Sequence, residues 1–146
     1  MLHWGLILMA YPYFREMAGQ AGRLLQIQGE FSTIQIRRKM SALYGEREKV
    51  NVATKKILKT WKDLNVILPK EKAFIGQVIP ITNTMVKQWV CEAYLRATGK
   101  VAVEVNHLHE EPSLFPFQFT LVEQELKENK HLQLIYGQEA IRVGIR

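Results

Sequence analysis

The segment from Ser32 to Val78 constrains the fold most, because it holds a continuous series of helix and strand signals. Ser32 and Gln35 have the spacing of a capping box, which marks the start of a helix. Gly45 predicts the end of that helix, because glycine tolerates the left-handed backbone that commonly follows a last turn. A longer amphipathic helix and two β-prone runs come next. The segment therefore predicts helix, helix and hairpin in that order.

The longer helix has two contrasting faces. Its apolar residues recur at spacings of three and four, as expected for a buried stripe: Val50, Ala53, Ile57, Trp61 and Leu64, with Leu58 at the edge. The face expected to point outward carries Asn51, Thr54, Lys55, Lys59 and Lys62, with Lys56 at its edge. No carboxylate interrupts it before Asp63. A helix that only needs to be soluble more often mixes charge signs, so this face predicts a partner that carries phosphate.

The positive charge of the chain is concentrated in one segment. Residues 30–72 contain eleven Lys and Arg but five Asp and Glu, whereas the remaining residues contain nine of each. The net charge of +6 therefore arises in this segment, and the isoelectric point is near 9.5. This excess of positive charge favours nucleic acid or anionic lipid as partner.

The β-prone runs lie on both sides of the two helices. Residues 66–68 and 74–79 predict two strands, with the polar turn 69–72 between them. Residues 30–31 predict a short strand before the capped helix. The apolar spacing within residues 13–26 predicts a further helix upstream of that strand.

Residues 13–80 resemble the winged helix-turn-helix superfamily of bacterial regulators and related DNA-binding modules. The resemblance is carried by Ala53, Lys55-Lys56, Ile57-Leu58, Trp61 and Asn65-Val66-Ile67. Asn65 stands where many members have glycine, although asparagine also tolerates the conformation. The resemblance implies three helices and a hairpin wing, with the third helix entering the major groove of duplex DNA.

The resemblance also implies roles for individual residues. Asn51 is expected to read adenine and Lys55 to read guanine, and Thr54 to touch a base or a phosphate. The other cations are expected to hold phosphates, which fixes register without reading sequence: Arg37, Arg38, Lys49, Lys56, Lys59, Lys70 and Lys72.

The rest of the chain predicts an accessory part. We expect an α+β, mainly helical protein, in which residues 1–81 form the winged helix-turn-helix with an apolar N-terminal helix. Residues 82–146 form a small α+β extension with a helix, short strands and a closing hairpin. The apolar ends suggest a second copy of the chain or a protein partner. The alternative function is therefore an assembly subunit of a larger complex that uses the winged helix for docking.

Few residues suggest chemistry. Cys91 is the single cysteine, which excludes an internal disulfide and a Cys-based zinc site and fits a reducing compartment. His107, His109, Glu110 and Glu111 form the one metal-like cluster, and we interpret it as a solvated loop. The aromatic run 114–119 lacks interleaved basic residues, so we interpret it as core or interface. We expect no enzyme activity, no cofactor and no bound metal.

The apolar N-terminus predicts neither a signal peptide nor a membrane span. It lacks a positively charged start, and Pro12 interrupts a run that is already too short to cross a bilayer. We expect a cytoplasmic protein with no membrane partner.

Overall fold

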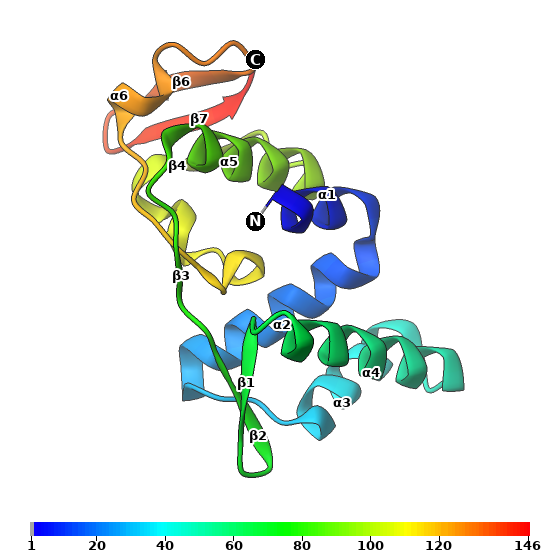
Figure 1. Cartoon of the computed structure of the whole chain (residues 1–146). Coiled ribbons are helices and arrows are strands. Elements are labelled where there is room, and N and C mark those ends of the chain that lie inside the picture. The colour runs from blue at the N-terminus through cyan, green and yellow to red at the C-terminus, as the bar shows by residue number, and fades with distance from the viewer. Residues whose placement is uncertain (1) are drawn as a thin grey trace. The chain divides into compact units, whose positions relative to one another are not determined.

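Helices make up most of the ordered elements, and the strands are short, so the protein is α+β and mainly helical as expected. The computed structural model describes residues 2–146 (Figure 1). The chain divides into two units. The basic unit consists of Glu16–Ile79 and Pro112–Pro116, and the sheet unit contains residues 2–15, 80–111 and 117–146. Helix α2 (Pro12–Gln28) begins in the sheet unit and continues through the basic unit.

The basic unit starts with the predicted helices. The buried side chains of α2 in this unit are apolar and lie in the segment whose apolar spacing predicted this helix: Met17, Ala18, Ala21 and Leu24. Helix α3 (Thr33–Tyr44) begins at a capping box in which the Ser32 hydroxyl accepts from the Gln35 N–H at 3.2 Å. The Gln35 side chain accepts from the Ser32 N–H at 2.8 Å. The predicted cap is therefore confirmed in both of its bonds.

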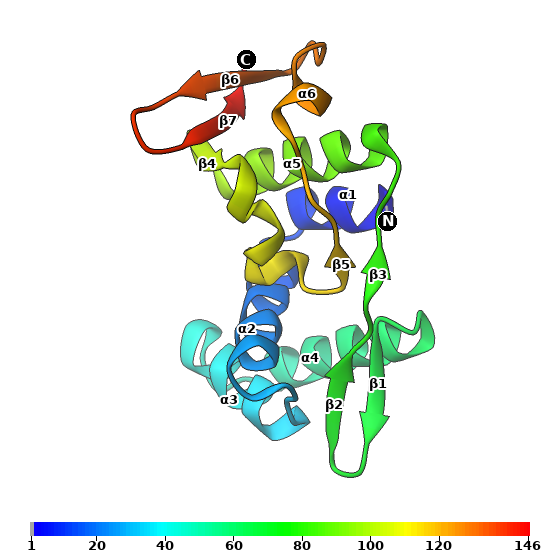
Figure 2. The same ribbon diagram turned by 90° about the vertical axis from the view of Figure 1, so that its left-hand side faces the viewer.

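A hairpin follows α4 (Glu48–Asp63) in the basic unit (Figure 2). Strands β1 (Ile67–Lys70) and β2 (Ala73–Gly76) are antiparallel, and Lys70 lies opposite Ala73. Phe31 adds a single antiparallel bridge to Phe74, with N···O distances of 3.0 and 2.8 Å. The short strand expected at residues 30–31 is thus one bridged residue that ties the start of α3 to the hairpin.

Helix α4 is rotated about its axis relative to the sequence prediction. The structure buries Val50, Thr54, Leu58 and Trp61. Thr54 was expected to face outward, and that prediction is wrong, because its side chain is fully buried. Its hydroxyl donates to the Val50 carbonyl oxygen at 2.9 Å, which satisfies the polar group inside the core. Leu64 was expected to be buried but is 67% exposed, because the helix ends at the residue before it.

A distant segment completes the core of the basic unit. Trp61 meets the edge of Phe115 with ring centroids 5.3 Å apart. A Cβ atom on Gly22 would lie 1.8 Å from the Pro112 carbonyl oxygen, so the backbone at Pro112 lies directly against α2. The aromatic run 114–119 therefore packs into core at Phe115, as the sequence analysis interpreted it.

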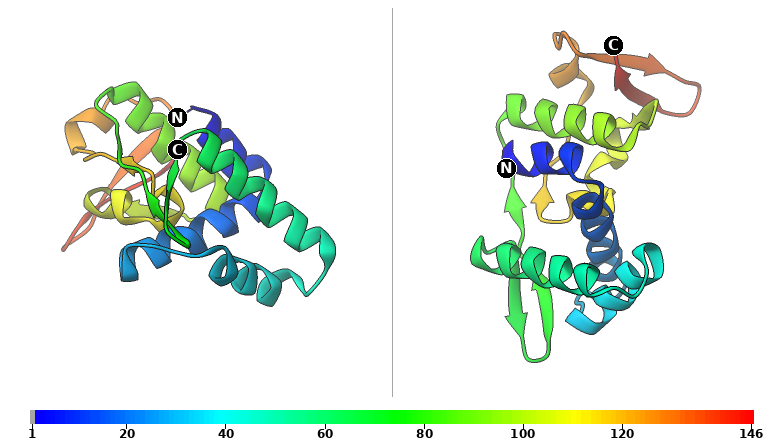
Figure 3. Two further views of the ribbon diagram at one scale, coloured as in Figure 1. Left: turned by 60° about the horizontal axis from the view of Figure 1, so that its bottom comes forward. Right: turned by 90° about the vertical axis from the view of Figure 1, so that its right-hand side faces the viewer.

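The sheet unit is built on two helices that lie side by side (Figures 1 and 3). Helix α1 (Leu2–Ala10) packs against α5 (Thr84–Thr98). A Cβ atom on Gly5 would lie 2.8 Å from the Ala93 Cβ atom, so a larger residue at position 5 would force the helices apart. Trp4 meets Phe14 edge to face, with centroids 4.9 Å apart. None of the helices in residues 2–146 combines the length and apolar character needed to cross a membrane.

A three-stranded antiparallel sheet closes the sheet unit. Its order is β4 (Ala102–Glu104), β7 (Ile141–Ile145) and β6 (Leu132–Tyr136), and β6 with β7 forms the predicted closing hairpin. The remaining elements are short: β3 (Ile79–Pro80) paired with β5 (Phe117–Gln118), the 3₁₀ helices η1 (Val105–Glu110) and η2 (Pro112–Leu114), and α6 (Glu123–Leu126). Helix α6 is only four residues long.

Candidate nucleic-acid interface

Most of the predicted DNA-contacting residues reach solvent. The exposed ones are Arg38, Lys49, Lys55, Lys56, Lys59, Lys70 and Lys72. All of them belong to the basic unit. Arg37 and Asn51 are half-buried, and Thr54 is buried. Because a fully buried hydroxyl that is already bonded to the helix backbone cannot meet a nucleotide, Thr54 is removed from the candidate site.

The outward face of α4 carries cations with weak local partners. Within residues 2–146, Lys55 forms no ion pair. The Lys59 ammonium lies 3.3 Å from the Asp63 carboxylate, one helical turn away, and the two side chains are 76% and 55% exposed. Exposed i, i+4 pairs contribute only about 0.3–0.5 kcal/mol, so a phosphate oxygen can replace Asp63 at small cost. This face can therefore bind a polyanion without disturbing the core.

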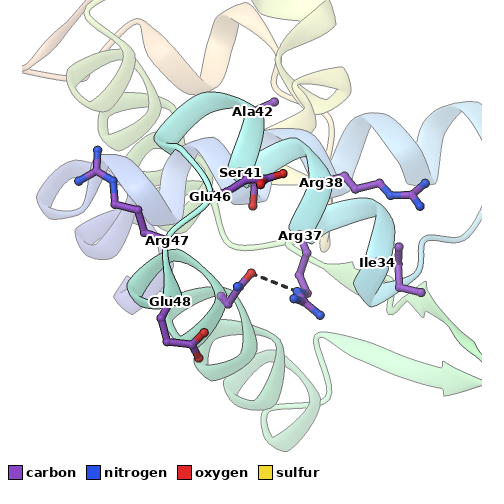
Figure 4. Close-up of a pocket in the computed structure, with 9 residues that line it drawn as sticks. Ile34, Arg37, Arg38, Ser41, Ala42, Glu46, Arg47 and Glu48 are labelled. Carbon is purple, nitrogen blue, oxygen red and sulfur yellow. Dashed lines mark hydrogen bonds between the residues drawn. The ribbon is translucent and has the colours of Figure 1, made fainter.

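A pocket of about 670 Å³ opens between α3 and the start of α4 (Figure 4). It is lined by Ile34, Arg37, Arg38, Ser41, Ala42, Glu46, Arg47, Glu48 and Asn51. Three guanidinium groups and two carboxylates thus share one concave surface. Arg47 was not predicted as a site residue, although an arginine directly before a basic helix is a signal for it.

Arg37 and Asn51 are joined across this pocket. The Arg37 Nε donates to the Asn51 Oδ1 at 3.2 Å, which is the bond drawn at Arg37 in Figure 4. The two residues are fourteen positions apart and come from different helices. The bond fixes the amide of Asn51 near the first turn of α4, where the sequence analysis expected a base-reading residue.

The hairpin tip is less positive than the sequence suggested. The Lys70 ammonium lies 3.4 Å from the Glu30 carboxylate, and both side chains are more than 40% exposed. Glu71 and Lys72 form the two-residue loop, and Glu71 has a φ of 55°, a conformation that favours glycine. At the tip, Lys72 has no ion partner within residues 2–146. Lys70 must exchange the Glu30 carboxylate for a phosphate before it can bind DNA.

In the sheet unit, His107 and Cys91 have raised pKa values for different reasons. The His107 Nδ1 lies 2.8 Å from Glu110, and this hydrogen bond raises the pKa of His107 above 6.5. No group of three or more potential metal ligands occurs in residues 2–146. Burial, and next the charge of Glu92, raise the pKa of Cys91 to about 12, so its thiol stays protonated at neutral pH.

The chain was compared with protein-family models, with curated proteins and with solved structures, and no match was found in any of the three.

Proposed function

We propose that the basic unit is a winged helix-turn-helix module that binds duplex DNA, with α4 as recognition helix and the β1–β2 hairpin as wing. The order of elements supports this proposal: a helix, the bridge at Phe31, α3, α4 and the hairpin. The bridge to Phe74 supports it further, because it joins the segment before α3 to the hairpin that follows α4.

One observation carries the proposal. From Lys49 to Lys62, α4 contains five lysines and no acidic residue, and all five are exposed. Like charges one turn apart destabilise a helix by a few tenths of a kcal/mol each. Phosphates along a DNA groove offset this repulsion between lysines, because each phosphate neutralises the charge that it contacts. Each contact also releases condensed counterions, which favours binding.

In this proposal the site residues have distinct roles. Asn51 and Lys55, near the start of α4, reach base edges, and the surrounding cations bind phosphates. Arg47 joins the phosphate-binding set because it lines the same pocket as Arg37 and Arg38. The protein acts in the cytoplasm by binding rather than by catalysis, as a transcriptional regulator without a cofactor, and the sheet unit serves dimerisation or partner docking.

The test is a titration of fluorescein-labelled duplex DNA with the whole protein, read by anisotropy at several salt concentrations. We expect a slope of log K against log salt of about −4 to −8, as several phosphate contacts produce. Absence of binding at low salt would refute the proposal.

A second candidate function is a protein-docking subunit. It is favoured by the exposed apolar side chains of α3 and α4, where Ile34 is 59%, Leu43 is 53% and Val52 is 38% exposed. The double variant Lys55→Glu, Lys59→Glu separates the two candidates. DNA binding is abolished by this charge reversal if the first is right, whereas a complex that persists through nuclease, high salt and charge reversal supports the second.

A further inference from the structure

Strand β6 lies at the outer edge of the sheet unit's sheet, because β7 pairs between it and β4 (Figure 2). Successive backbone groups of a strand point to opposite sides, and two hydrogen bonds show which groups of β6 face β7. The Arg146 N–H donates to the His131 carbonyl oxygen at 2.8 Å, and the Gly137 N–H donates to the Ala140 carbonyl oxygen at 3.1 Å. The odd-numbered residues therefore bond to β7. The backbone groups of three residues point to the open side: Leu132, Leu134 and Tyr136.

Part of this open side is already satisfied. The Leu132 N–H donates to the Asn129 Oδ1 at 3.0 Å, and the Leu132 carbonyl oxygen accepts from the Arg146 Nε at 3.4 Å. The outward backbone groups of Leu134 and Tyr136 have no hydrogen-bond partner within residues 2–146. They form a short open edge, which is a template for another strand.

The common devices that block such an edge are missing from β6. Proteins protect edge strands with charged side chains, proline or a bulge. The sequence of β6 is LQLIY, which has neither charge nor proline, and its register with β7 runs without a bulge. Two of its large side chains are exposed, Ile135 by 38% and Tyr136 by 63%.

The charge of the sheet unit favours a second copy of the chain as the occupant. Its three segments contain eight Lys and Arg and eight Asp and Glu, so the basic unit holds the whole net charge of +6. Two sheet units can therefore approach each other without net repulsion. An acidic or a basic peptide finds no complementary charge on β6, whereas a second β6 offers an equally uncharged strand.

We infer that two copies of the chain pair through antiparallel β6 strands, which joins their sheets into one. The twofold axis passes Ile135, the centre of the open edge, so that Ile135 lies opposite Ile135 of the partner subunit. Leu134 of each copy then lies opposite Tyr136 of the partner subunit and exchanges two backbone hydrogen bonds with it. The inference rests on the proposed function only for the docking role of the sheet unit, and it is independent of DNA binding.

Sedimentation velocity of the whole protein tests the pairing. Up to about 100 µM we expect a reversible dimer with a micromolar Kd, as small interfaces give. Its mass should be twice the chain mass of 17.0 kDa. Ile135→Lys places like charges directly opposite each other and should raise the Kd at least about tenfold. The control Val101→Lys adds the same charge at an apolar side chain of the same unit that is 87% exposed and lies outside the strands, so it should leave the Kd unchanged. Circular dichroism melting verifies that each variant is folded.

Ile135→Cys tests the register directly. Opposite residues in a non-hydrogen-bonded antiparallel pair have Cα atoms about 4.5 Å apart, within the range of about 4.4–6.8 Å that a disulfide spans. With oxidised glutathione, this variant should form a covalent dimer on a non-reducing gel, and the control Val101→Cys should not. The native Cys91 does not interfere, because it is buried.

The outcomes separate this inference from the proposed function. A protein that stays monomeric up to about 100 µM overturns the inference, since a micromolar Kd is then excluded; the proposed function stands if that monomer binds duplex DNA. A dimer that survives Ile135→Lys, or that Ile135→Cys fails to cross-link, forms through another surface and overturns the inference as well. A dimer through β6 that binds no duplex at low salt supports the inference and refutes the proposed function.

Discussion

Removing two lysines from the outward face of α4 should weaken DNA binding in a way that depends on salt. Lys55 and Lys59 are replaced together by alanine, which suits a helix interior. Lys55 has no ion partner within residues 2–146, and Lys59 has only its exposed pair with Asp63. The substitutions therefore cost the fold no more than about 0.5 kcal/mol.

The size of the effect follows from the number of contacts. The proposed site has eight cations predicted from the sequence, and Lys55 is counted among them because a base-reading lysine in the groove also displaces counterions from the neighbouring phosphates. Eight such cations correspond to a salt slope of about −7. Two fewer contacts lower it to about −5.5. Between 50 and 200 mM salt, the wild-type affinity should fall about 20,000-fold and that of the variant about 2,000-fold. If the two proteins bind equally at 1 M salt, the double variant should bind about 30-fold more weakly at 0.1 M salt.

The sheet unit offers a matched control. Lys130 forms no ion pair within residues 2–146, and Lys127 pairs with Glu123 one turn away at 3.1 Å, as Lys59 does with Asp63. The variant Lys127→Ala, Lys130→Ala therefore lowers the net charge of +6 by the same two units. It also removes an ion pair of the same kind. Its salt slope should equal that of the wild type.

Anisotropy titrations of the three proteins at four salt concentrations supply the slopes. The reasoning is refuted if the α4 variant keeps the wild-type slope, because its lysines then meet no phosphate. It is refuted equally if the salt slopes of both double variants fall by the same amount, since binding then depends on the net charge of the protein and not on the lysines of α4.

Three further predictions concern the stability of the fold and the pKa of His107. Gly22→Ala should lower the free energy of unfolding by about 3 kcal/mol in urea denaturation, because its Cβ atom would lie 1.8 Å from the Pro112 carbonyl oxygen. Glu71→Gly should raise the free energy of unfolding by about 1 kcal/mol, seen as a higher melting temperature, because glycine adopts a φ of 55° without strain. Glu110→Gln should lower the pKa of His107 toward 6.5 in an NMR titration, because the hydrogen bond to Glu110 is what raises it.

Each of these has its own control or counter-result. Gly19→Ala lies on the same helix with no atom within 4 Å of the new Cβ, so it should not destabilise the protein. A lower melting temperature for Glu71→Gly contradicts the strain argument. For His107 the raised folded pKa means that its pair with Glu110 contributes stability below the unfolded pKa of about 6.5. That contribution is lost as pH rises through the folded pKa, and Glu110→Gln should remove this pH dependence.

Local signals predicted most of the basic unit. The spacing of Ser32 and Gln35 located the start of α3, and Gly45, with a φ of 87°, marks its end. These features depend on bonds between residues close in sequence, so a sequence shows them directly. Glu71 is an exception, because no local pattern indicated that a charged residue would adopt a positive φ in the loop.

Long-range contacts account for what the sequence could not show. The bond from Arg37 to Asn51 depends on how α3 crosses α4, and no periodicity within either helix encodes it. The packing of Pro112 on Gly22 joins segments about ninety residues apart. Thr54 was wrongly assigned to the outward face of α4 because threonine is a polar residue type. A hydroxyl that bonds to its own helix can nevertheless be buried.

The rotation of α4 also limits how the proposed module can distinguish sequences. With Thr54 in the core, the outward face of α4 presents lysines. Lysines bind phosphates at little cost, but a phosphate contact carries no information about the base sequence. Base reading is left to Lys55 and to Asn51, and the oxygen of Asn51 is held by Arg37. The module should therefore bind many duplexes with strongly salt-dependent affinity and discriminate weakly among their sequences.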